Sequence, residues 1–99
     1  MLIEQARSLV DEHIAGIGID LGDGAMWCES RFADGWILVS SRKGITGGRH
    51  FIVMDDGDVH LELGSLPPRW YAAKHSSQGD GVSIVVVNDN LERTPSKES

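Results

Sequence analysis

The N-terminal segment places apolar side chains at three- and four-residue steps. The members of this series are Leu2, Ala6, Leu9, Val10, Ile14 and Ile17. This spacing puts one apolar stripe along a helix, with charged residues mostly opposite it. Gly16 and Gly18 follow and supply the glycine signal that commonly ends a helix. The sequence therefore predicts an amphipathic helix over residues 2–15.

The pattern then changes to the two-residue alternation that is typical of strands. AMWCESRF and GWILVSS flank the turn signal Ala33-Asp34-Gly35 and predict one hairpin, and FIVMD and DVHLELG predict a second. VSIVVVN, near the C-terminus, is rich in β-branched residues, which favour strands. Because its apolar character is nearly continuous, we interpret it as a central strand.

The segment SLPPRWYAAKH predicts a short helix, with Ser65 as a candidate cap and Pro67 and Pro68 in its first turn. The order helix, four strands, short helix and strand predicts an α+β fold. We expect the N-terminal helix to pack on one face of a mostly antiparallel sheet of about five strands, which leaves the other face to solvent or a partner. Residues 1–90 are predicted to form this single domain, and residues 91–99 a polar, flexible tail.

Composition narrows the function classes. The 99-residue chain has a formal net charge of −6 and an isoelectric point near 5.0, which disfavours nucleic-acid binding and suits a basic protein partner. Cys28 is the single cysteine, so no intramolecular disulfide is expected and a reducing compartment is indicated. No run approaches the roughly 18 apolar residues of a membrane span, and the N-terminus does not resemble a signal peptide. We therefore expect a cytoplasmic protein that has no membrane partner.

The acidic run DDGD, residues 55–58, contains Asp56-Gly57, which is among the strongest short hairpin signals. A two-residue loop would pair Asp55 with Asp58. A three-residue loop ending in a glycine bulge would pair Met54 with Asp58 instead. We favour the second register, because it avoids placing two carboxylates directly opposite each other.

In either register, Asp58, His60 and Glu62 lie on the face of the second strand that points away from the core. Their types fit a metal site, but adjacent same-face side chains on one strand rarely close such a site alone. The run also does not match a calcium-binding loop. We therefore expect no metal and no cofactor, and we interpret this face as solvated or as bound to a partner.

Two further segments carry weaker chemical hypotheses. Cys28 together with His50 or His60 would supply a nucleophile and a base. A buried thiol fits better, because Cys28 shares its strand face with Met26. RKGITGGR, residues 42–49, has the composition of a phosphate cradle but lacks the GK[ST] of a P-loop, so a hairpin connection is favoured.

Three tryptophans, Trp27, Trp36 and Trp70, are many for a chain of this size. Most should lie in the core or at its edge, because each buries a large area. A tryptophan on the open sheet face would be an interface anchor, since tryptophan is enriched at binding hot spots.

Several short motifs are similar to those of one bacterial family. They are GWIL at 35–38, GRHFIV at 48–53, DDGDVH at 55–60 and GSLPP at 64–68. Together they resemble the YrhB-like or immunity-protein-35-like domains, over roughly residues 2–75. That family is thought to include immunity proteins that neutralise toxins, and it has no established catalytic residues. The resemblance implies a binding protein.

The sequence thus predicts a small non-enzymatic protein of the immunity type that neutralises a toxin by binding it, with a basic toxin domain as the candidate partner. The candidate binding residues are Asp55, Asp56, Asp58, His60, Glu62, Trp36 and Trp70. An accessory or chaperone-like interaction domain is the first alternative. A small hydrolase that uses Cys28 and a histidine is the second.

Overall fold

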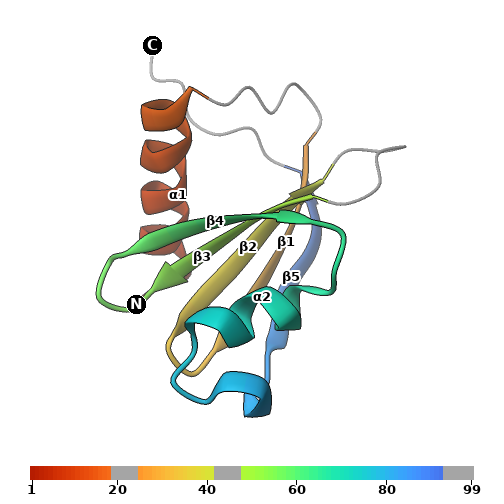
Figure 1. Cartoon of the computed structure of the whole chain (residues 1–99). Coiled ribbons are helices and arrows are strands. Elements are labelled where there is room, and N and C mark those ends of the chain that lie inside the picture. The colour runs from red at the N-terminus through yellow and green to blue at the C-terminus, as the bar shows by residue number, and fades with distance from the viewer. Residues whose placement is uncertain (19–24, 42–47, 93–99) are drawn as a thin grey trace.

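The structure, a computed structural model, describes residues 1–18, 25–41 and 48–92. The elements are α1 (Ile3–Ile17), β1 (Met26–Phe32), β2 (Gly35–Ser41), β3 (Gly48–Met54), β4 (Val59–Gly64), α2 (Pro68–His75), a 3-10 turn (Gly79–Gly81) and β5 (Val85–Glu92). The strands form one sheet in the order β4-β3-β2-β1-β5, and each neighbouring pair is antiparallel (Figure 1). The predicted α+β architecture is confirmed.

Helix α1 ends at Ile17, two residues beyond its predicted end at Ala15. Gly18 adopts the left-handed conformation with a φ of 75°, and its N–H donates to the Ile14 carbonyl at 3.0 Å. This conformation is one that glycine adopts without steric cost, so Gly18 caps the helix. The residues of the predicted stripe that are buried are Ala6, Val10 and Ile14.

Both predicted hairpins form. Phe32 pairs with Gly35 across a two-residue turn in the first. In the second, the Met54 N–H donates to the Asp58 carbonyl at 2.8 Å, and Gly57 has a φ of 101°. The loop therefore contains three residues and ends at glycine, which confirms the register that avoids opposed carboxylates.

The core has two layers, one on each face of the sheet. On the first face α1 covers Trp27, Trp36, Leu38, Phe51 and Val53. On the second face, α2 and the segment after it contribute Tyr71, Ala72 and Val82. These pack on Phe32, Ile37 and Ile52 of the sheet in a smaller cluster. The expectation of an open second face was wrong, because α2 folds back across β2 and β3 (Figure 1).

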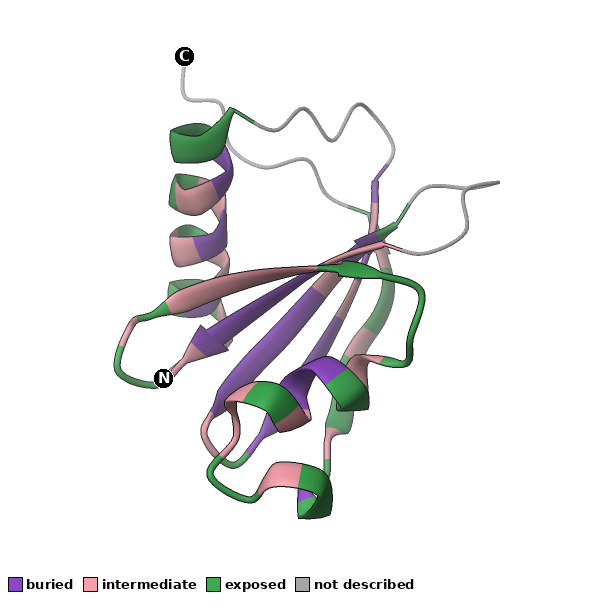
Figure 2. Cartoon of the chain, in the orientation of Figure 1, coloured by how far each residue is buried: buried purple, intermediate pink, exposed green. Residues whose placement is uncertain are grey.

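Strand β5 lies at an edge of the sheet, so the prediction of a central strand was wrong. Val85, Val86 and Val87 are 66%, 54% and 49% exposed (Figure 2). An apolar run marks a strand but does not state how many neighbours the strand has. β5 also continues to Glu92, so it includes the first two residues of the predicted tail, and residues 93–99 lie outside the described part.

The start of α2 differs from its predicted cap. Pro67 occupies the N-cap position and Pro68 begins the helix, whereas Ser65 lies before it. Proline suits this first turn because its missing N–H would have no helical partner there. Of the predicted RKGITGGR connection, residues 42–47 lie outside the described residues, and Gly48 and Arg49 belong to β3.

Candidate functional site

Carboxylates gather where the two hairpin turns meet, at one end of the sheet. We call Asp34, Asp55, Asp56 and Asp58 the acidic end. The Asp55 N–H donates to the Asp34 carbonyl at 2.9 Å, which fixes the two turns side by side. Asp34, Asp55 and Asp56 line an open cavity of about 220 Å³ together with Met54. The fold therefore adds Asp34 to the acids that the sequence placed in one turn.

Hydrogen bonds keep two members of the acidic end, Asp34 and Asp55, ionised. Arg31 donates to both carboxylate oxygens of Asp55 at 2.8 and 2.9 Å, and this contact holds the pKa of Asp55 below its usual value. The Ser77 N–H donates to Asp34 at 2.9 Å, and this bond, with the hydroxyls of Ser76 and Ser77, lowers the pKa of Asp34. Both carboxylates are therefore charged at neutral pH.

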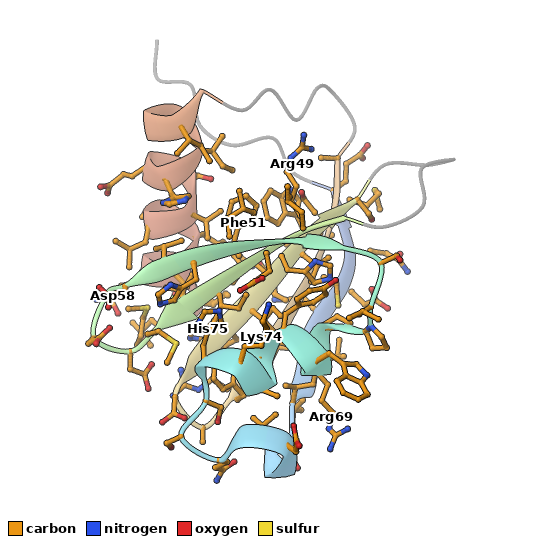
Figure 3. The ribbon with its side chains drawn as sticks, viewed as in Figure 1. Arg49, Phe51, Asp58, Arg69, Lys74 and His75 are labelled. Atoms are coloured by element: carbon orange, nitrogen blue, oxygen red, sulfur yellow. The ribbon has the colours of Figure 1, made fainter. Side chains whose placement is uncertain are left out.

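Asp56 and Asp58 are the members of the acidic end that form no salt bridge with a described residue. Both residues are exposed to solvent. The Asp58 N–H donates to Asp56 Oδ1 at 3.0 Å, which fixes the turn while leaving the carboxylates open to a partner. Figure 3 shows Asp58 at the β3–β4 turn, away from Lys74 and His75.

His60 and Glu62 do not join the acidic end, although they point to the same face of the strand as Asp58. Glu62 accepts hydrogen bonds from Lys74 at 3.1 Å and contacts the His75 Nε2 at 2.9 Å. The contact with His75, and then that with Lys74, lowers the pKa of Glu62. The His60 and His75 rings stack with centroids 4.2 Å apart. These side chains therefore fasten α2 to β4.

Two of the three tryptophans are buried and one is exposed, as expected if most tryptophans lie in the core or at its edge. Trp27 and Trp36 are buried, and the Trp36 indole N–H donates to the Met1 carbonyl at 3.0 Å, so Trp36 is no surface anchor. Trp70 is 55% exposed on α2. It lines a shallow cavity of about 170 Å³ with Arg69, Ala73 and Asp80. Of the candidate tryptophans, Trp70 alone has the exposure that a binding anchor needs.

Cys28 and His50 lie on the same face of the sheet but not in contact. Cys28 pairs with Val39, and Val39 pairs with His50, so two strand spacings, about 10 Å, separate them. Burial raises the pKa of the Cys28 thiol, which leaves it protonated at neutral pH. The surroundings of Cys28 are those of a partly buried structural thiol.

His50 is a buried titratable group in the layer beneath α2. It is 3% exposed, its ring lies 4.2 Å from that of Tyr71, and its Nδ1 has no hydrogen-bond partner within the described residues. Burial lowers the pKa of His50 in the folded state. The neutral ring is therefore the form that the fold accommodates.

The fold should consequently lose stability in acid in two stages. Below about pH 6.5 the unfolded state binds a proton at His50 that the folded state does not, so stability falls as pH falls. A further loss follows below about pH 4.5, because the unfolded state then binds protons at Glu62 and Asp55 that the folded state, with its lowered pKa values, does not yet bind. Urea unfolding of the His50→Leu variant should show a shallower decline between pH 6.5 and 5. An identical slope in both proteins would contradict the assignment to His50.

Sequence patterns did not reveal the partly buried ion pair between Arg7 and Glu29. Arg7 donates from Nε and Nη2 to the two carboxylate oxygens of Glu29, each at 2.7 Å. Asn88 of β5 donates to Glu29 Oε1 at 2.9 Å. Glu29 is fully buried. The signal was present, because strand alternation places Glu29 on the face of Trp27, where a carboxylate requires partners.

No protein-family model matches this sequence, and neither a curated protein nor a solved structure is detectably similar to it. In the described part of the chain, no His, Cys, Asp and Glu side chains form a group of three able to hold a metal ion. No described helix has the length and apolar character needed to span a membrane.

Proposed function

We propose that this chain is a small non-enzymatic binding protein of the immunity type, which neutralises a basic toxin domain by covering its active surface. The observation that supports the proposal best is the acidic end, where two turns hold ionised carboxylates around an open cavity. Complementary charge accelerates association and selects between partners. The motif resemblance to immunity-type domains points to the same class of function.

Trp70 is the candidate for a second contact. Arg69 beside it donates from Nε to the Val82 carbonyl at 3.1 Å and from Nη2 to the Asp80 carbonyl at 2.8 Å, so this part of α2 is held firmly. Tryptophan and arginine are the residue types most enriched at binding hot spots. In this proposal the acidic end steers the toxin and a firmly held aromatic surface adds affinity.

The proposed toxin neutralisation is tested with the toxin domains encoded by genes that neighbour the gene for this chain. We expect co-expression to restore growth and the purified pair to associate rapidly at low salt. The double substitution Asp56→Lys, Asp58→Lys should slow association by about tenfold or more at low salt, because steering by charge contributes factors of that order. It should also weaken the dependence of the rate on salt.

The matched control is Glu12→Lys, Glu92→Lys. Both residues are exposed and lie on α1 and β5, so the net charge changes equally while the acidic end is kept. An equal loss of association rate in both variants would show that net charge, and not the acidic end, steers the partner. Failure of every neighbouring toxin domain to bind would favour the accessory-domain alternative.

A further inference from the structure

Helix α2 covers a buried histidine on strand β3 (Figure 1). The His50 side chain is 3% exposed, its ring lies 4.2 Å from the Tyr71 ring of α2, and Tyr71 is itself buried. Within the described residues, His50 Nδ1 has no hydrogen-bond partner. A charged ring at this position needs water or an acceptor, because an unpaired buried charge is costly. Movement of α2 away from the sheet would admit that water.

The charged and titratable groups around His50 come from α2 and β4. They are Tyr71, Lys74 and His75 on the helix, and His60 and Glu62 on the strand. On its other side, β2 contributes the apolar Val39. Glu62 lies opposite His50 in the sheet, but its carboxylate is bound by Lys74 and His75. Burial lowers the pKa of His50 more than the hydrogen bonding and charge of its surroundings raise it.

Few buried side chains hold α2 in place. Of its eight residues, only Tyr71 and Ala72 are buried. Its last turn is tied to β4 through Glu62, and the segment after it is tied to Asp34, which accepts a hydrogen bond from the Ser77 N–H at 2.9 Å. Segments with few buried contacts open at a lower free energy than the whole fold. The sheet and α1 can therefore stay folded while α2 moves.

Gly64 supplies a hinge between β4 and α2. It ends β4 with a φ of 151°, and a Cβ at this position would collide with the Tyr71 hydroxyl. That hydroxyl accepts a hydrogen bond from the Leu66 N–H at 3.3 Å, so the connection folds against the helix when α2 lies on the sheet. Glycine adopts this and other backbone conformations at little steric cost. The chain can therefore change direction at Gly64 when α2 moves.

We propose that α2 is an acid-opened lid: protonation of His50 releases residues 65–81 from the sheet and uncovers the apolar cluster of this face. Arg69 donates to the Asp80 carbonyl at 2.8 Å, so α2 and the 3-10 turn move as one unit. Below about pH 6.5, the ordinary pKa of histidine, the open state binds a proton that the closed state does not. Opening therefore becomes more favourable as pH falls.

The other titratable groups act in both directions. A positive charge on His75 strengthens its contact with Glu62 and favours the closed lid. Charges on both His60 and His75 would repel each other in their ring stack and favour the open lid. Hydrogen bonds lower the pKa values of Glu62 and Asp34, so both carboxylates stay ionised above about pH 5. A test must therefore separate His50 from His75.

Amide hydrogen exchange at pH 7 and pH 5.5, with and without dilute urea, tests the lid. The α2 amides should be protected at least about tenfold less than those of α1, because they exchange through local opening. Their protection should depend little on urea, since the opening exposes little surface. Between pH 7 and pH 5.5 it should fall several-fold, toward a limit of about eightfold for one histidine with an ordinary pKa in the open state.

Equal protection of α2 and α1, with the same dependence on urea, would overturn the proposal, because α2 would then open only when the whole chain unfolds. An α2 protection that is the same at both pH values would also overturn it.

Three variants identify the group that senses acid. His50→Leu and His50→Gln remove the titrating ring, and both should lose the fall in α2 protection. His75→Gln is the matched control: it keeps an N–H donor for Glu62 but removes the histidine stack, and it should keep the fall. An undiminished fall in the two His50 variants, or its loss in His75→Gln, would overturn the assignment to His50.

Discussion

Replacing Arg7 with methionine should lower the free energy of unfolding by about 3 kcal/mol, as expected for a buried ion pair that loses one partner. Glu29 is fully buried, and its carboxylate would keep only part of its hydrogen bonding, including the bond from Asn88. We place the effect at the lower end of the usual range because the Arg7 side chain is 27% exposed. Urea denaturation at pH 7 measures the loss.

The chain contains a matched control for this effect. Arg31 binds both oxygens of Asp55 with nearly the same distances, but the side chains are 34% and 40% exposed. Arg31→Met should therefore cost about 1 kcal/mol or less, because solvent screens an exposed pair. Equal losses in Arg7→Met and Arg31→Met would show that the burial of Glu29 is unimportant.

The pH dependence of Arg7→Met identifies Glu29 as the cause. Without the guanidinium, burial should raise the folded-state pKa of Glu29 above its unfolded value. The variant's deficit should then be smallest near pH 4 and should grow as pH rises through that folded pKa. The double variant Arg7→Met, Glu29→Gln removes the charge and should recover much of the loss at pH 7.

Replacing Phe51 with alanine should cost about 3–5 kcal/mol, the range for large-to-small aromatic substitutions in a core. Phe51 is fully buried in the layer beneath α1. Its ring lies 6.0 Å from that of Trp27 and 6.3 Å from that of His13, so it contacts both the sheet and the helix (Figure 3). Few surrounding side chains can move to fill the cavity, because interiors are close-packed.

Alanine substitutions of two β4 leucines should cost less stability than Phe51→Ala, in proportion to how far each leucine is buried. Leu61, which pairs with Phe51, is partly buried, so Leu61→Ala should cost less than Phe51→Ala. Leu63 is 67% exposed, and Leu63→Ala should change stability by only about 0.5 kcal/mol. Thermal or urea unfolding that gives the three variants the same loss would contradict the placement of the core.

Local signals predicted the parts of this fold that form locally. The apolar stripe and Gly18 defined α1. Asp56-Gly57 marked the second turn, and the need to keep two carboxylates from facing each other favoured the three-residue loop that forms. The positions of β5 and α2 depend on contacts between distant segments. A run such as VSIVVVN states that a strand forms, but its neighbours are decided by the other strands. The same limit explains why the second face was expected to be open.

The candidate site divides in the same way. Asp55, Asp56 and Asp58 were predicted together because one turn holds them, whereas Asp34 joins them through a second turn that is distant in sequence. His60 and Glu62 were placed on the correct strand face, but their role changed when α2 supplied His75 as a partner. Strand alternation gives the direction of a side chain and not what lies above it.

The contact between Asn88 and Glu29 also bears on the order in which the chain folds. The first four strands are joined in sequence by successive hairpins, which close early because their loops are short. β5 pairs with β1 only after the four hairpin-linked strands and α2 have been made, since 59 residues separate Glu29 from Asn88. On a growing nascent chain, β1 would therefore keep an open edge beside an incompletely bonded carboxylate until β5 has been made. We expect this interval to be when a chaperone protects the protein most.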